Sequence, residues 1–250
     1  MPGIYLSVII PVYNEEKRLP KTLEEIQDYL SRQNYPSQGS GQANYEIIVV
    51  NNGSKDRTVE VVENLVPEIA NLKLLNNEEN RGKGFAVKQG MLEARGDYRI
   101  FTDADNSTSI DQLAKILPWF ENGYDVVIGS RDIKGAILDP PQPWQRRMTG
   151  EGFKLYRKII LGLWGIQDTQ CGFKGFTKKA AENIFPKCKI EGFSFDPEVL
   201  LIAQKLNYKT KEIPVYWKND PDSKVKLKAM IKMAIDLLKI KWNLITKKYS

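Results

Sequence analysis

The chain contains no histidine among its 250 residues and only two cysteines, Cys171 and Cys188. The first absence excludes a Ser-His or Cys-His nucleophile system and any zinc site with histidine ligands. Two cysteines do not make a disulfide framework, so a reducing compartment is expected. Any bound metal must therefore be held by carboxylates, carbonyl oxygens or thiolates.

Long hydrophobic runs are also missing. The most apolar segment, residues 158–166, is much shorter than the roughly 18 apolar residues that a membrane-spanning helix requires. The chain opens at Met1 without a signal peptide. We therefore expect a cytoplasmic protein without a transmembrane helix.

Acidic residues are in the minority, with 31 Asp and Glu against 37 Lys and Arg, so the formal net charge is +6. A mildly basic balance favours anionic partners, such as a phosphorylated substrate or an anionic membrane surface. Nucleic-acid binding would rest on this balance alone, and we do not expect it.

Short apolar segments alternate with segments of helical periodicity through the first half of the chain. Strands are predicted at 6–10, 45–50, 72–75, 98–102 and 124–128, and helices at 15–32, from 56 onward, at 84–94 and at 109–120. The Ile and Val runs are continuous rather than alternating, which indicates strands that are covered on both faces. The predicted fold class is α/β, a mostly parallel sheet with helices on both faces.

After residue 131 this alternation ends. Helices are predicted at 149–163 and 196–205, a strand at 211–215, and a final helix at 225–247. Polar side chains form a narrow seam along the final helix: Lys228, Lys232, Asp236, Lys239, Asn243 and Thr246. Its other surface is largely apolar, which suits contact with a membrane or a partner subunit, with burial on two sides within the fold as the alternative.

Two carboxylates, Asp103 and Asp105, follow the predicted strand 98–102 directly. At the carboxyl end of a buried strand they are expected to lie in the crevice above the sheet, where they suit a hard cation such as Mg²⁺ or Mn²⁺. An isolated Asp-x-Asp is more often a surface turn. The polar loops 11–15, 51–54 and 129–131 leave the same edge of the sheet, however, and this gathering favours a site.

Three of these segments, 8–16, 51–58 and 103–105, resemble the family-2 glycosyltransferases with the GT-A fold. Segments 168–176, 195–200 and 212–217 look like the branch that makes dolichyl-phosphate glucose from UDP-glucose, with dolichyl-phosphate mannose synthases as near neighbours. The resemblance covers essentially the whole chain. It implies a glycosyltransferase domain over 1–222, with a nucleotide-sugar half at 1–130 and an acceptor half at 131–222, followed by an amphipathic helix at 223–250.

The resemblance implies a donor site and an acceptor site. The donor, a UDP-sugar, would meet these residues: Pro11, Tyr13, Glu15, Asn51, Asn52, Arg81, Lys83, Asp103, Ala104 and Asp105. Asp103 and Asp105 would hold the Mg²⁺ or Mn²⁺ on the diphosphate. The acceptor, a polyprenyl phosphate, would be gripped by Arg131 and by Arg146 or Arg147, with Gln170 nearby.

A further candidate for the chemistry is Asp196, because some relatives place a catalytic base there; a helix N-cap before Pro197 explains it equally well. A phosphate acceptor, with a second pKa of about 6, is already an oxyanion at neutral pH. A general base is then dispensable, which agrees with the absence of histidine. Attack in line with the leaving group would invert the anomeric configuration.

One departure from the family concerns Asn51 and Asn52, where two aspartates are usual. Two charges near the diphosphate are lost, so donor affinity or base preference can differ. Other readings are therefore a different nucleotide-sugar such as GDP-mannose, a saccharide acceptor, or a scaffold without turnover. The membrane helix at the N-terminus of the eukaryotic glucosyl enzymes is also absent here, so attachment to a membrane would fall to the final helix and to a basic face made of Arg131, Arg147, Lys154, Arg157 and Lys158. The final helix also offers a route to oligomers.

Overall fold

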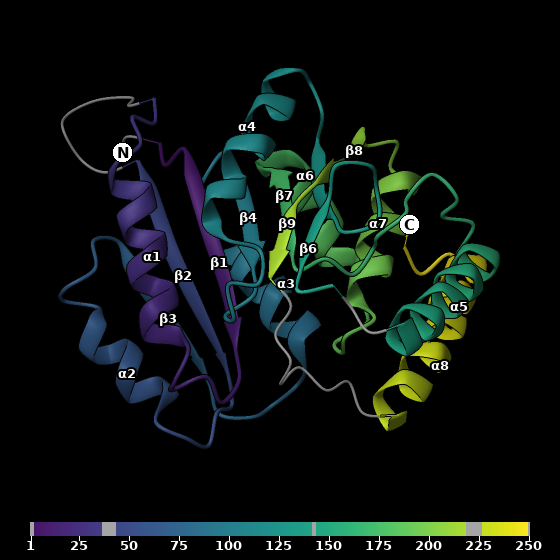
Figure 1. Cartoon of the computed structure of the whole chain (residues 1–250), viewed down its shortest axis with the longest axis horizontal. Helices are drawn as coiled ribbons and strands as arrows, with labels where there is room; N and C mark the ends of the chain where they lie inside the picture. The colour runs from purple at the N-terminus through teal and green to yellow at the C-terminus, as the bar shows by residue number, and fades with distance from the viewer. Residues whose placement is uncertain (1–2, 37–43, 142–143, 219–226, 250) are drawn as a thin grey trace.

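The structure, a computed structural model, describes residues 3–36, 44–141, 144–218 and 227–249, without the side chains of 144–147, 149 and 227–230. One seven-stranded sheet runs through the molecule, with helices on both of its faces (Figure 1). Its strands are β1 (Leu6–Val12), β2 (Tyr45–Asn52), β3 (Leu72–Asn77), β4 (Tyr98–Thr102), β5 (Val126–Ser130), β7 (Phe173–Thr177) and β8 (Thr210–Pro214). Their order is β3-β2-β1-β4-β7-β5-β8, and only β7 runs antiparallel to its neighbours.

The helices are α1 (Leu19–Ser31), α2 (Thr58–Leu65), α3 (Lys83–Glu93), α4 (Leu113–Glu121), α5 (Trp144–Leu161), α6 (Lys178–Ile184), α7 (Phe195–Lys205) and α8 (Leu227–Ile245). Short 3-10 turns at Ile110–Gln112 and Phe185–Lys187 precede α4 and follow α6. A second, two-stranded sheet joins β6 (Ile137–Asp139) to β9 (Tyr216–Lys218) in parallel. Within the described residues no helix is both long enough and apolar enough to cross a membrane.

Continuous apolar runs give the sheet two buried faces. Every residue of β1 and β2 is buried, and successive side chains point to opposite faces. Ile9 packs into a core with α3, α6 and α7, whereas Val8 and Ile10 pack into the core beneath α1 and α4. The predicted α/β fold with a mostly parallel sheet is therefore confirmed.

The sheet gathers the expected loops at one edge. Because β1, β2, β4 and β5 are parallel, their carboxyl ends lie at the same edge. The antiparallel β7 starts at that edge, since Phe173 pairs with Thr102 at the end of β4. The residues just before β7 are thus delivered beside the Asp103–Asp105 loop.

Several predicted boundaries differ from the structure. The helix expected from Glu15 begins at Leu19, because residues 16–18 form a turn in which the Arg18 N–H donates to the Glu15 carbonyl. The fifth strand ends at Ser130 rather than at 128, so Gly129 and Ser130 belong to the sheet. The sequence pattern did not predict β7 or α6.

Candidate active site

The loop after β4 holds its two aspartates in a fixed turn. The backbone N–H of Asn106 donates to the Asp103 carbonyl at 3.2 Å, and the N–H of Ser107 donates to Asp105 Oδ1 at 3.0 Å. Ala104 is buried, and its carbonyl accepts a 2.8 Å bond from the Thr22 hydroxyl of α1. Both carboxylates are half-buried. The loop is therefore anchored to the fold and is not a free surface turn.

Lys83, the first residue of α3, lies against this loop. Its Nζ is 2.5 Å from Asp103 Oδ1. Burial on its own would lower the pKa of Lys83, but the nearby carboxylates of Asp103, Asp196 and Asp105 outweigh it and raise the pKa. A cation is thus fixed beside the loop before any substrate arrives.

A second buried ion pair lies close to the first. Lys174 of β7 is fully buried, and its Nζ is 2.5 Å from Asp196 Oδ1 in the first turn of α7. Asp196 does not cap α7, because Ser194 holds the N-cap position. Burial raises the pKa of the Asp196 carboxyl, against the opposing charges of Lys174 and Lys83. Asp196 is thus paired with Lys174 in this structure.

Gly172 permits the close approach of β7 to the loop. A Cβ at this position would lie 1.9 Å from Asp103 Oδ2. Only a residue without a side chain lets the Asp103 carboxylate keep its position. The preceding Cys171 is fully buried, and burial raises the pKa of its thiol to about 11, so it is no nucleophile at neutral pH.

We expect Gly172→Ala to displace Asp103 and to reduce transfer strongly, with a loss of stability of about 1–3 kcal/mol from overpacking. Gly165→Ala is the matched control, because a Cβ there meets no atom within 4 Å and its backbone φ is not positive. The measurements are turnover and urea unfolding of both variants. Equal activities would show that the position of Asp103 does not depend on Gly172.

The carboxylate of Glu15 also lies near the two aspartates. This carboxylate receives two bonds from Arg18, with Arg18 Nε at 2.8 Å. Burial raises the pKa of Glu15 despite Arg18, and the charges of Asp105 and Asp103 raise it further. The carboxylate of Glu15 is therefore close to both. In the same loop Pro11 is buried in β1, and Tyr13 is exposed at the surface.

Asn51 and Asn52 are buried at the end of β2, where each amide is already bonded. Asn51 Nδ2 donates to Asn76 Oδ1 at 2.8 Å, and Asn51 Oδ1 accepts from the N–H of Ser54 at 3.1 Å. Asn52 Nδ2 donates to Asn80 Oδ1 at 3.0 Å, and Asn52 Oδ1 accepts from the N–H of Arg81. The two amides thus hold the loops that lead to Arg81 and Lys83.

Arg81, another predicted donor residue, is engaged by an acid and an aromatic ring in this structure. Its guanidinium pairs with Glu191 and lies 3.8 Å from the centre of the Phe85 ring. Both partners also line a cavity of about 410 Å³ with Arg81. Neither Asp103 nor Asp105 lines this cavity, so it is a neighbour of the crevice and not the crevice itself.

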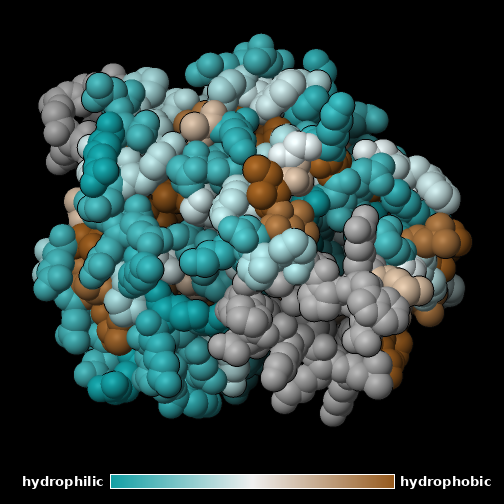
Figure 2. All heavy atoms as spheres, viewed as in Figure 1, coloured by the Kyte–Doolittle hydropathy of each residue, from teal (hydrophilic) through white to brown (hydrophobic). Residues whose placement is uncertain are grey.

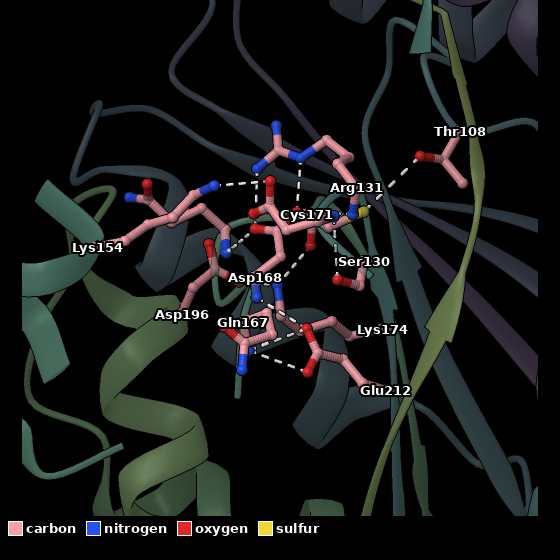
Figure 3. Close-up of polar contacts among 12 residues, drawn as sticks. Thr108, Ser130, Arg131, Lys154, Gln167, Asp168, Cys171, Lys174, Asp196 and Glu212 are labelled. Carbon is pink, nitrogen blue, oxygen red and sulfur yellow. Dashed lines mark hydrogen bonds and ion pairs between the residues drawn. The ribbon is translucent and has the colours of Figure 1, made fainter. Parts of the chain in front are cut away.

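Arg131, just after β5, is held by Asp168 (Figure 3). Its Nε and Nη2 donate to the two carboxylate oxygens at 2.7 and 2.9 Å, and its backbone N–H donates to the same group. Burial would raise the pKa of Asp168, but the Arg131 charge and these bonds hold it well below its usual range. The pair uses two of the five guanidinium donors, which leaves the others for a ligand.

The position of Asp168 is itself fixed by hydrogen bonds to the backbone of residues 166–168. Glu212 of β8 accepts the backbone N–H groups of Gln167 and Asp168, the latter at 2.7 Å (Figure 3). Arg157 of α5 donates to the carbonyl oxygens of Ile166 and Gln167 at 3.1 Å. The backbone N–H of Gln170 donates to Asp168, which places Gln170 next to the pair.

Residues 7–185 match the family model for glycosyl transferase family 2. The chain belongs to glycosyl transferase family 2. The predicted family and its glycosyltransferase character are thereby confirmed.

Relatives of this family-2 glycosyltransferase match nearly the whole of its sequence. It is 41% identical over 246 residues to a dolichyl-phosphate beta-glucosyltransferase of Trichomonas vaginalis, covering 96% of this chain and 73% of that protein. It is 34% identical over 255 residues to the dolichyl-phosphate beta-glucosyltransferase of Homo sapiens, covering 98% of this chain and 77% of that protein.

Solved structures show the same fold. Mannosyl-3-phosphoglycerate synthase from Rubrobacter xylanophilus has a TM-score of 0.66 at 17% identity, covering 98% of this chain and 75% of that one. Glucosyl-3-phosphoglycerate synthase from Mycobacterium tuberculosis in complex with uridine-diphosphate has a TM-score of 0.61 at 17% identity, covering 96% and 80%. The predicted GT-A type of α/β fold is confirmed.

The donor set of this glycosyltransferase fits a divalent cation that is shared with a substrate. Asp103 and Asp105 supply two carboxylates, and the described residues contain no cluster of three or more His, Cys, Asp or Glu side chains suited to a metal. Mg²⁺ commonly binds through one or two carboxylates together with waters and substrate phosphates. Two aspartates on a fixed turn meet that requirement.

The structure brings seven of the fifteen predicted site residues of this glycosyltransferase into two linked groups. Glu15, Lys83, Asp103, Asp105 and Asp196 form one group. Lys83 binds Asp103 directly, the charges of Asp103 and Asp105 act on the pKa of Glu15 and of Lys83, and those of Lys83 and Asp103 act on the pKa of Asp196. Arg131 and Gln170 meet at Asp168 in the other. The two are joined along the chain, because Gly172 touches Asp103 while Cys171 lies near Arg131 and Asp168. Arg146 and Arg147 lie in the first turn of α5, and their side chains are outside the described part of the structure.

Sequence reasoning assigned no role to four residues of this arrangement: Gly172, Lys174, Asp168 and Glu212. A lysine and an aspartate within a segment that must be buried indicate buried ion pairs, because buried charges need partners. The sequence does not say which partners.

The acid stability of this glycosyltransferase should reflect two buried carboxylates, Asp168 and Glu46. Burial opposes ionisation of Glu46, but bonds from Lys73, the Arg95 N–H and Ser7 outweigh it, and its pKa is lowered like that of Asp168. As the pH falls, the unfolded chain, with carboxyl pKa values near about 4, takes up protons first. The free energy of unfolding is therefore expected to fall progressively below about pH 5.

Urea unfolding between pH 7 and pH 3 measures this slope. Glu46→Gln should be less stable at pH 7 and lose less stability on acidification than the parent chain. A variant with the parent slope would show that Glu46 does not contribute to acid unfolding.

Proposed function

We propose that this enzyme transfers glucose from UDP-glucose to a polyprenyl phosphate of the dolichyl type, with inversion at the anomeric carbon. The observation that carries the proposal is the identity of 34–41% to dolichyl-phosphate beta-glucosyltransferases over nearly the whole chain. UDP as the nucleotide is supported by the solved neighbour of the same fold that holds uridine-diphosphate.

The geometry supports a division of labour between the two groups of residues. Glu15, Asn52, Lys83 and the two aspartates lie where parallel strands end, which is the usual ligand edge of such a sheet. Asp103 and Asp105 would hold Mg²⁺ or Mn²⁺, which when bound offsets the charge that develops on the leaving diphosphate. Lys83 supplies a second positive charge at the same place.

Arg131 would orient the acceptor phosphate with the guanidinium donors that Asp168 leaves unused. In the reaction, an oxygen of the phosphate dianion forms the new bond to the anomeric carbon. The bond from that carbon to the diphosphate breaks, and its electron pair leaves with UDP. No proton has to be removed from the acceptor, so Asp196 can remain paired with Lys174.

Because the acceptor is a lipid, we place the reaction at the cytoplasmic surface of a membrane. The test is an assay in detergent with radiolabelled UDP-glucose, polyprenyl phosphate and Mg²⁺ or Mn²⁺, followed by organic extraction. Label in the lipid phase that disappears with EDTA supports the donor, the acceptor and the metal together. Lipid-phase label from GDP-mannose but not from UDP-glucose would refute the proposed donor.

A further inference from the structure

The final helix, α8, carries large apolar side chains on its exposed side as well as on its buried side. Leu237, Ile240 and Asn243 are buried against the body, and Asn243 donates to the Tyr249 hydroxyl at 3.3 Å. The opposite side carries a stripe of large apolar side chains that are 51–62% exposed: Ile231, Ile235, Leu238, Trp242 and Ile245. A helix that only covered a core in water would carry polar side chains on that exposed side.

The helix α5 adds a second stripe beside the first. Leu155 and Ile159 are 55% and 62% exposed, and Trp164, just beyond the end of the helix, is 59% exposed. α5 and α8 pack side by side at the end of the molecule opposite α2 (Figure 1). Hydrophobic side chains appear at the same end in Figure 2. We call these two stripes together the α5–α8 face.

The charge around this face is positive. Residues 227–248 contain six lysines and a single acid, Asp236: the lysines are Lys228, Lys232, Lys239, Lys241, Lys247 and Lys248. On α5, Lys158 lies between Leu155 and Ile159 in the sequence. A surface that is apolar at its centre and basic around it matches the anionic surface of a lipid bilayer. A second copy of the chain would bring lysines against lysines, which is unfavourable.

The other side of α5 reaches the acceptor group of the site. Arg157 holds the carbonyl oxygens of Ile166 and Gln167 just before Asp168, and Lys154 binds Asp132 next to Arg131 at 2.6 Å. One helix therefore connects the exposed apolar stripe to the residues around Arg131. A phosphate at a bilayer surface in contact with α5 would lie near that arginine.

We propose that the α5–α8 face docks on the anionic surface of a lipid bilayer and so brings Arg131 to the phosphate of its lipid acceptor. The docking rests on the lysines and the exposed apolar stripes. The delivery of the acceptor rests in addition on the proposed function.

The experiment compares the full chain with the double variant Ile235→Ser/Trp242→Ser. Val66→Ser is the matched control, because Val66 is an exposed apolar residue that follows α2 at the opposite end of the molecule. Binding is measured by flotation with vesicles of phosphatidylcholine, with and without phosphatidylglycerol. We expect the parent chain and the control to prefer the anionic vesicles, and the double variant to bind about tenfold more weakly.

Transfer is then measured with two acceptors, a long polyprenyl phosphate in the vesicles and a short, water-soluble prenyl phosphate. The double variant is expected to lose transfer to the first and to keep it with the second. Unchanged vesicle binding by the double variant would overturn the proposal. A dimer of the parent chain that becomes a monomer in the double variant, without a change in vesicle binding, would assign the face to a second copy instead. If the parent chain binds anionic vesicles through this face but glucosylates neither acceptor, the docking stands and the proposed function fails.

Discussion

Replacing Asp105 with asparagine is expected to reduce sugar transfer by about 10²–10³-fold, the usual loss when a group that stabilises developing charge is removed. The amide oxygen can still accept the 3.0 Å bond from the Ser107 N–H, so the turn after β4 should survive. What is lost is a negative charge, which in the proposed function is a ligand for a divalent cation. The measurement is the rate of lipid-phase glucose transfer at saturating donor and acceptor.

A second measurement separates the metal from the turnover. Binding of Mn²⁺ in the presence of UDP, followed by electron paramagnetic resonance, should weaken in Asp105→Asn. The matched control is Asp28→Asn, because Asp28 is an exposed acid on α1 whose side chain is 71% accessible. If Asp105→Asn kept both the parent rate and the parent affinity for Mn²⁺, Asp105 would not be a metal ligand.

Asp168→Asn is expected to destabilise the fold and to weaken acceptor binding together. The substitution leaves the Arg131 cation, whose side chain is only 22% exposed, without its bidentate partner. Breaking a buried pair from one side typically costs about 3–5 kcal/mol. Since Arg131 is then free to leave its position, the KM for the polyprenyl phosphate should rise much more than the KM for the donor.

Urea unfolding and steady-state kinetics measure the two effects. Asp132→Asn is the control, because it removes the neighbouring, partly exposed pair with Lys154, which should contribute about 0–1 kcal/mol. Arg131→Lys serves as a second variant in case Asp168→Asn does not fold, since it keeps the charge and loses the fork. Equal changes in both KM values would argue against an acceptor role for Arg131.

The sequence predicted the parts of the fold that depend on local pattern. The strand at 98–102 has the predicted bounds: Tyr98, Ile100 and Phe101 give it its apolar character, and Gly96 and Asp103 border it. The start of α1 was predicted four residues too early: residues 16–18 form a turn, and side chains 43 and 40 residues further along the chain bind the N–H groups of Glu15 and Glu16. No local pattern carries that information.

β7 was missed for a different reason. Its five residues include Lys174 and Gly175, which together read as a loop rather than as the centre of a sheet. Lys174 can be buried there only because Asp196, 22 residues away, neutralises it. A pattern of hydrophobicity cannot show that a charge has a partner.

The sequence also indicated those parts of the candidate site that depend on local pattern. Asp103 and Asp105 stand out because two carboxylates at the end of a buried strand are costly to bury without a partner. The structure holds both in one turn. The position of Arg131 could not be predicted, because Arg131 is held by Asp168, and the backbone N–H of Asp168 is in turn bound by Glu212. Such a chain of bonds depends on the neighbourhood of β5 and β8 in the sheet.

The position of β7 also bears on how the chain can fold during synthesis. β5 pairs only with β7 and β8 in the sheet, so it has no neighbour until residues 173–177 are made. Until then β4 has one free edge, and a chain that stops after β5 would expose unpaired strands. The late strand that carries Gly172 to Asp103 is thus also the strand that closes the sheet. Nascent chains that are released before residue 177 should aggregate rather than persist as a folded N-terminal half.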